Sequence, residues 1–134
     1  MDTSKIVNTL KNALEIMGCD SALISDIDHH STIELSFNDR SSILCSTTED
    51  VVMLWCILAK YNSQALLNGA AQLIEPLVKN HEWIATGQLQ LLENDGDLVL
   101  RAILGNDVIE QGDLLADALG QFFDYSETFT QVLR

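Results

Sequence analysis

The chain has 134 residues, a usual length for one domain, so we expect a single domain over residues 1–134. Its 20 acidic and 7 basic side chains give a formal net charge of −13 at pH 7, which disfavours nucleic acid and anionic membranes as partners and favours basic or apolar polypeptides. No run of 18 apolar residues and no secretory signal pattern occurs, so we expect neither membrane insertion nor export.

The first half of the chain predicts one helix and three strands. Apolar residues recur at helical spacing over residues 3–17, and Gly18 follows as a stop. Residues 31–37 alternate between apolar and polar, which is typical of a half-buried strand, and a second short strand follows at 42–46. The third strand, 51–58, is apolar on both faces. Because these strands are short and joined by tight turns, they are predicted to form an antiparallel meander.

The second half predicts a helix, a hairpin and a last helix. The helices cover about residues 63–78, capped by Ser63, and 113–133, and the strands cover 88–93 and 98–104. The Asp-Gly pair between the two strands favours a tight hairpin turn. The element order is therefore α-β-β-β-α-β-β-α, which predicts an α+β domain with helices packed on a twisted antiparallel sheet.

The helix at 63–78 carries two apolar stripes about 100° apart. The first stripe consists of Leu66, Ala70, Leu73 and Leu77, and the second of Leu67, Ala71, Ile74 and Val78. One stripe can face the sheet of its own chain, and the other needs a second cover. We therefore expect a homodimer whose interface includes Leu67, Ala70, Leu73, Ile74 and Leu77. Pro76 should kink the last turn of this helix.

The third strand has more apolar surface than a sheet with helices on one side requires. Its two faces consist of Val51, Met53, Trp55 and Ile57 on one side and Val52, Leu54, Cys56 and Leu58 on the other. One face fills the core, and a helix, a second subunit or a bound peptide covers the other. We favour Trp55 as the core residue and Leu54 as the binding residue. The predicted binding set is Leu44, Val52, Leu54 and Cys56.

No residue pattern in the sequence indicates catalysis. The densest polar cluster, Asp26-Ile27-Asp28-His29-His30, has the side chains that bind divalent metals. Its members are adjacent in an expected loop rather than spaced along a helix, so we interpret them as a polar loop and predict no metal site and no cofactor. Nucleophile elbows and phosphate-binding glycine loops do not occur, so we expect no catalytic residues and no enzyme.

The three cysteines, Cys19, Cys45 and Cys56, are odd in number and share no CxxC spacing. They are interpreted as free, buried thiols in a reducing compartment.

Several segments, taken in chain order, carry a family likeness. They are residues 18–24 with 27–35, then 53–56, then 87–91 with 97–100, and finally 122–125. In their order, and with the length and acidity of the chain, they resemble the InvB/SpaK family, which are class IB type III secretion chaperones. The resemblance spans nearly the whole chain, although no single motif is specific to the family.

The resemblance implies an α+β homodimer in the bacterial cytoplasm that works without ATP. Such chaperones bind the N-terminal, non-globular segments of one or more effector proteins, keep them competent for secretion and release them at the secretion ATPase. The resemblance brings no catalytic residues with it. The alternative from another class is a dimeric α+β regulatory module that binds a small ligand, and co-purification with an effector fragment would distinguish the two.

Overall fold

The computed structural model describes residues 3–18, 24–27, 32–37, 40–48 and 51–134. The strands in these residues are β1 (Ile24–Ile27), β2 (Thr32–Phe37), β3 (Arg40–Thr48), β4 (Val51–Lys60), β5 (Gln90–Asn94) and β6 (Asp97–Ile103). The helices are α1 (Thr3–Ile16), α2 (Ser63–Asn68), α3 (Ala70–Leu77), α4 (Asn106–Glu110) and α5 (Gly112–Val132). Across the described residues the strands form one antiparallel six-stranded sheet in the order β1-β2-β3-β4-β6-β5.

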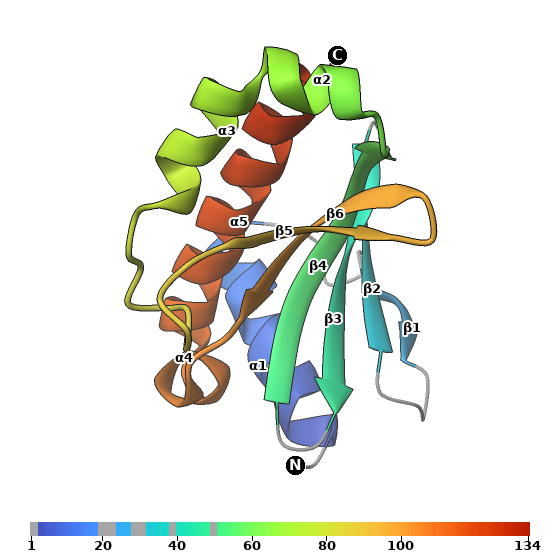
Figure 1. The fold of residues 1–134 in the computed structure, drawn as a ribbon. Helices are drawn as coiled ribbons and strands as arrows, with labels where there is room; N and C mark the ends of the chain where they lie inside the picture. Colours follow the sequence, from blue (N-terminus) through green and yellow to red (C-terminus); the bar gives the residue numbers. More distant parts are fainter. Residues whose placement is uncertain (1–2, 19–23, 28–31, 38–39, 49–50) are drawn as a thin grey trace.

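The predicted α+β class and the antiparallel meander are confirmed. Strands β2, β3 and β4 follow one another in the sheet, and β6 pairs with the far side of β4. The helices α1 and α5 lie together on one face of the sheet, with α3 beside α5 (Figure 1). The sheet therefore has an inner face, which the helices cover, and an outer face that the described helices leave uncovered.

The core lies between the inner face of the sheet and the helices α1 and α5. Large side chains from both layers are fully buried there, among them Leu10, Leu14, Phe122 and Phe129 from the helices and Ile33, Leu35, Ile43 and Leu54 from the strands. The helical and the alternating periodicities each bring one apolar face to this contact.

The hairpin between β5 and β6 turns at Asp95 and Gly96. Both residues have positive φ, 52° and 84°, as a type I′ turn requires. The Gly96 N–H donates to a carboxylate oxygen of Glu93 at 3.1 Å, which fixes the turn further. The hairpin predicted from the Asp-Gly pair is therefore confirmed, and the strand order leaves β5 at one edge of the sheet.

The helix expected over 63–78 is divided at Gly69 into α2 and α3 (Figure 1). Gly69 is buried, and a Cβ atom there would lie 2.5 Å from Cγ1 of Val132 at the end of α5. Only glycine allows the backbone to approach α5 this closely. The cap also differs from the expectation, because the side chain of Asn62, not Ser63, accepts the N–H groups of Gln64 and Ala65.

Two short elements were not expected from the sequence. Strand β1 lies in a segment that was predicted as a loop, and it pairs with β2 from Ile24↔Leu35 to Ile27↔Ile33. Helix α4 lies between the strand expected over 98–104 and the helix expected over 113–133, and it buries Val108 and Ile109. Both elements are too short for a periodic signal, so their formation depends on packing against the rest of the domain.

Candidate protein-binding surfaces

The inner face of β4 belongs to the core. Val52, Leu54 and Cys56 are almost completely buried beneath the helices, with exposures of 1%, 0% and 2%. These three side chains were expected to form a binding surface with Leu44, and that expectation is wrong for them. Leu44 is not on their face, because its partner in the sheet is Trp55 and directly opposed residues point to the same side.

The outer face of the sheet carries the other apolar set of β4. Sheet register aligns Met53 with Ile103, Trp55 with Arg101 and Ile57 with Val99, and it aligns Leu44 with Trp55 and Leu92 with Val99. We call this set the outer sheet face, and its apolar members are Leu44, Met53, Trp55, Ile57, Leu92, Val99 and Ile103. Val99 is buried, and the other members are half-buried or exposed. It spans four adjacent strands, so an uncovered apolar patch crosses the middle of the sheet.

Trp55 lies at the centre of the outer sheet face and is half-buried, whereas the sequence favoured it as a core residue. Its indole Nε1–H donates to the Ser46 hydroxyl at 2.8 Å. This hydrogen bond fixes the polar end of the indole against β3. The ring is therefore held in place as part of the apolar surface of this face.

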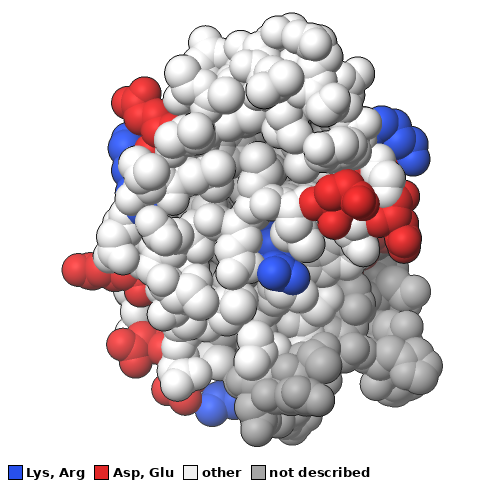
Figure 2. Space-filling model, in the orientation of Figure 1, with Lys and Arg blue, Asp and Glu red and all other residues white. Residues whose placement is uncertain are grey.

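Charged groups are sparse over the middle of the face shown in Figure 2, while acidic side chains gather near the tip of the β5–β6 hairpin and along the opposite border. The cation within the outer sheet face is Arg101, between Trp55 on β4 and Gln90 on β5. Its Nε–H donates to the Gln90 side-chain oxygen at 2.7 Å. Arg101 was not among the binding residues expected from the sequence, although it is the only charged position in the otherwise apolar run 98–104.

The helices α2 and α3 present the second uncovered apolar surface. Leu73 is buried in the core, and Leu66 and Leu77 pack against it half-buried. The other stripe faces outward, with exposures of 71% for Leu67, 56% for Ile74 and 63% for Val78. The expectation that Leu73 forms part of a subunit interface is therefore wrong, because its own chain already covers it, while Leu67 and Ile74 are accessible. Ala70 and Leu77 are half-buried.

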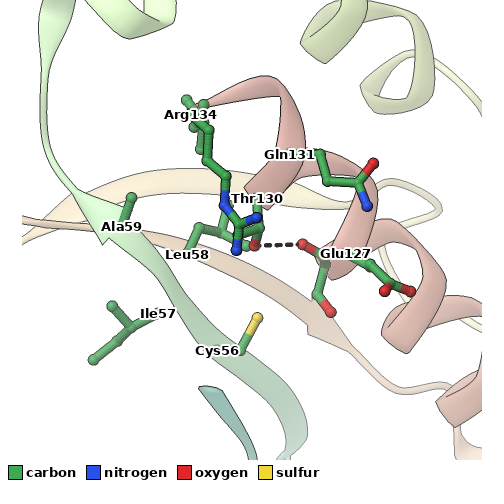
Figure 3. Close-up of a pocket in the computed structure, with 10 residues that line it drawn as sticks. Cys56, Ile57, Leu58, Ala59, Glu127, Thr130, Gln131 and Arg134 are labelled. Carbon is green, nitrogen blue, oxygen red and sulfur yellow. Dashed lines mark hydrogen bonds between the residues drawn. The ribbon is translucent and has the colours of Figure 1, made fainter. Parts of the chain in front are cut away.

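A cavity of about 520 Å³ lies between β4 and the end of α5 (Figure 3). Its lining includes Cys56, Ile57 and Leu58 from β4 and Thr130 and Arg134 from the C-terminal end of the chain. Among the described residues, the pairing of β3 with β4 runs only from Thr48↔Val51 to Leu44↔Trp55. The cavity thus sits beside a part of β4 to which β3 does not pair.

The two hydroxyl groups of α5 that line this cavity are hydrogen-bonded within the helix. The Thr130 hydroxyl donates to the Ser126 carbonyl at 2.7 Å, and the Ser126 hydroxyl donates to the Phe123 carbonyl at 2.7 Å. Neither hydroxyl is paired with a basic side chain in a way that would activate it as a nucleophile.

A second cavity, of about 380 Å³, is lined by residues 80–83 together with side chains of α4 and α5. Trp83 donates through Nε1 to Gln121 at 3.1 Å, and Gln121 donates to Asp117 at 2.9 Å. The His81 ring lies 5.6 Å from the Trp83 ring and 5.3 Å from the Tyr125 ring, and its Nε2 is buried with no hydrogen-bond partner among the described residues. Burial, with Lys79 nearby, lowers the pKa of His81.

Among the cysteines in the described part of the chain, Cys45 and Cys56 are buried and form no disulfide. Burial raises the pKa of the Cys45 thiol to about 12, so it stays protonated near neutral pH. Cys19 lies outside the described residues, as do Asp28, His29 and His30 of the polar cluster. Over residues that are described, no group of three His, Cys, Asp or Glu side chains could hold a metal ion, and no helix is long and apolar enough to span a bilayer.

Residues 18–95 match the family model of the Invasion protein B family. The chain belongs to this family. It is 34% identical, over 128 residues, to the surface presentation of antigens protein SpaK of Salmonella typhimurium, and equally to that of Salmonella typhi. The match covers 96% of this chain and 95% of each SpaK chain. The resemblance to the InvB/SpaK family is therefore confirmed.

Solved structures with the same fold include chains from two protein complexes. One is a chain of the HopA1–SchA chaperone–effector complex, with a TM-score of 0.60, 14% identity and 98% of each chain covered. The other belongs to the heterodimeric ExoU–SpcU complex from the type III secretion system of Pseudomonas aeruginosa, with a TM-score of 0.57, 22% identity and coverage of 92% of this chain and 93% of that one. Family membership and fold together indicate a type III secretion chaperone.

Proposed function

We propose that this Invasion protein B family member is a cytoplasmic chaperone that works without ATP on type III effector proteins. It binds the N-terminal, non-globular segments of one or more effectors, keeps them competent for secretion and assists their delivery to the secretion apparatus, where the secretion ATPase is the expected partner for release. The observation that carries this proposal is the outer sheet face, a wide apolar surface that the described helices of the chain do not cover.

The shape of this surface suits an extended polypeptide. A segment that is disordered before binding loses conformational entropy when it is bound, so it needs a large contact surface with apolar anchors. The outer sheet face offers half-buried anchors on four adjacent strands, including Trp55 on β4 and Leu44 on β3. Soluble monomers rarely leave such a patch open without a binding role.

The working unit that we propose is a homodimer, formed through the exposed stripe of α2 and α3. Leu67, Ile74 and Val78 are large apolar side chains that remain more than half exposed. This stripe lies on the helices, whereas the outer sheet face lies on the strands, so one surface can pair two subunits while the other holds an effector segment.

Co-purification tests the proposed function. The tagged chain would be produced in a bacterium with an active type III secretion system, and its bound proteins identified by mass spectrometry. We expect secreted effectors among them, and their recombinant N-terminal fragments should bind the purified chain directly in calorimetry. A thermal-shift screen with metabolites serves as the contrasting measurement. Stabilisation by a small metabolite, together with no binding of any effector fragment, would contradict the proposal and favour a ligand-binding module.

A further inference from the structure

The outer sheet face holds a cation where an apolar partner would be expected to find only apolar side chains. We infer that Arg101 pairs with a carboxylate of the bound effector segment, so that this face selects a segment with apolar side chains around an acidic residue. The inference rests on the proposed function and adds the chemistry of the segment and its position on the sheet.

The sheet register places Arg101 in the middle of the patch. A single row across the sheet runs from Glu34 through Leu44, Trp55 and Arg101 to Gln90. Ile103 and Val99, two positions away on either side of Arg101 along β6, point to the same face. A segment that covers Trp55 therefore also covers the guanidinium group.

Arg101 has no carboxylate partner in the described part of the chain. Its Nε–H donates to the neutral side chain of Gln90 at 2.7 Å, whereas Lys5 pairs with Glu110 and Lys60 pairs with Asp97. Glu34, the carboxylate in the same row, is three strands away, about 14 Å at the usual strand spacing. The remaining four N–H donors of the guanidinium are thus available to a partner.

Covering this group without an acceptor would cost free energy, because a cation that loses water must be paired. A carboxylate suits the planar guanidinium best, since it can accept two parallel hydrogen bonds. The net charge of −13 repels acidic segments elsewhere, so a local attraction at Arg101 would fix where the acidic residue binds.

A second copy of the chain is a poorer occupant of this face. A two-fold interface through the middle of the outer sheet face would bring Arg101 of one copy towards Arg101 of the other, and these two positive charges would repel each other. The exposed stripe of α2 and α3 has no cation at Leu67, Ala71, Ile74 or Val78, so it suits self-association better.

The test uses the full-length chain and a recombinant N-terminal effector fragment identified by co-purification. Calorimetry gives the affinity of wild type, Arg101→Gln, Trp55→Ala and the control Lys11→Gln, which removes one positive charge from an exposed position on α1. Each acidic residue of the fragment is replaced by its amide in turn and measured against wild type and Arg101→Gln. Thermal melting and light scattering check folding and oligomeric state.

We expect Arg101→Gln and Trp55→Ala each to weaken binding about tenfold or more, and Lys11→Gln to change it less than about twofold. Replacing one acidic residue of the fragment by its amide should weaken binding to the wild-type chain but not to Arg101→Gln, as expected for two groups that pair directly. Normal binding by Arg101→Gln and Trp55→Ala would overturn the inference and leave the proposed function standing.

Other results separate the remaining possibilities. Weaker binding by Arg101→Gln, with no acidic position of the fragment coupled to it, would overturn the carboxylate pairing. Loss of the dimer in Trp55→Ala would assign the outer sheet face to a second copy and overturn the inference as well. Failure of the wild-type chain to bind any effector fragment would contradict the proposed function itself.

Discussion

Replacing Ile74 by Asp should separate the proposed dimer without unfolding the chain. Ile74 and its neighbour Leu73 lie one residue apart on α3, but Ile74 is 56% exposed and Leu73 is 3% exposed. A carboxylate at position 74 therefore stays in water in the monomer and is buried only in the dimer. At position 73 the same charge would enter the core of the monomer, so Leu73→Asp should prevent stable folding.

The size of the effect follows from the exposed fraction. Full burial of an isoleucine side chain stabilises by about 1.5–3 kcal/mol, so covering the 56% that remains exposed contributes roughly 1–1.5 kcal/mol per copy. A two-fold interface uses each position twice, which doubles the loss to about 2–3 kcal/mol before the cost of burying the new carboxylates. The dimer dissociation constant should thus rise by at least about 30-fold to 100-fold.

Light scattering after size-exclusion chromatography, over a series of micromolar concentrations, measures this directly. Wild type should have about twice the 14.8 kDa mass of one chain, and Ile74→Asp should approach the mass of one chain while melting near the wild-type temperature. The matched control is Gln72→Asp, which adds the same charge at an exposed position of α3 outside the stripe. A monomeric wild type, or an Ile74→Asp variant as dimeric as the control, would refute the assignment of this interface.

Three further predictions concern stability. Leu54→Ala should lower the free energy of unfolding by about 2–5 kcal/mol, measured by urea denaturation, because Leu54 is completely buried, and a loss below about 1 kcal/mol would contradict its place in the core. Gly69→Ala should lower the free energy of unfolding by about 1–3 kcal/mol, because the added methyl group would contact Val132. The double variant with Val132→Ala should recover part of this loss, and no recovery would argue against that contact. Burial, with Lys79 nearby, lowers the pKa of His81 below its ordinary 6.5, so just below that pH the folded chain binds fewer protons than the unfolded chain. The free energy of unfolding should therefore fall between pH 7 and about 5.5, and it should fall less in His81→Gln. Identical pH profiles of the two proteins would exclude this role of His81.

Several features could be predicted from the sequence because they depend on local pattern. The helical spacing of α1 and α5, the alternation in β2 and the positive-φ turn at Asp95 and Gly96 each have a signal within a few neighbouring residues. The two apolar stripes over residues 63–78 also follow from spacing, but spacing did not show that the chain itself covers the stripe of Leu73 and exposes the stripe of Ile74. The break of this helix at Gly69 could not be predicted from the local pattern, since it depends on Val132, more than sixty residues away.

The two faces of β4 show where local pattern ends. Alternation places Trp55 and Leu54 on opposite faces of β4, but the residues of both faces are apolar. The pattern therefore does not indicate which face lies in the core. Tertiary packing decides it. The helices α1 and α5 cover the side of the sheet that carries Leu54 and its partner Cys45, and they leave Trp55, Leu44 and Arg101 on the other side. The sequence alone therefore showed that both faces of β4 are apolar, whereas only the contact of distant helices with the sheet determined which face lies in the core.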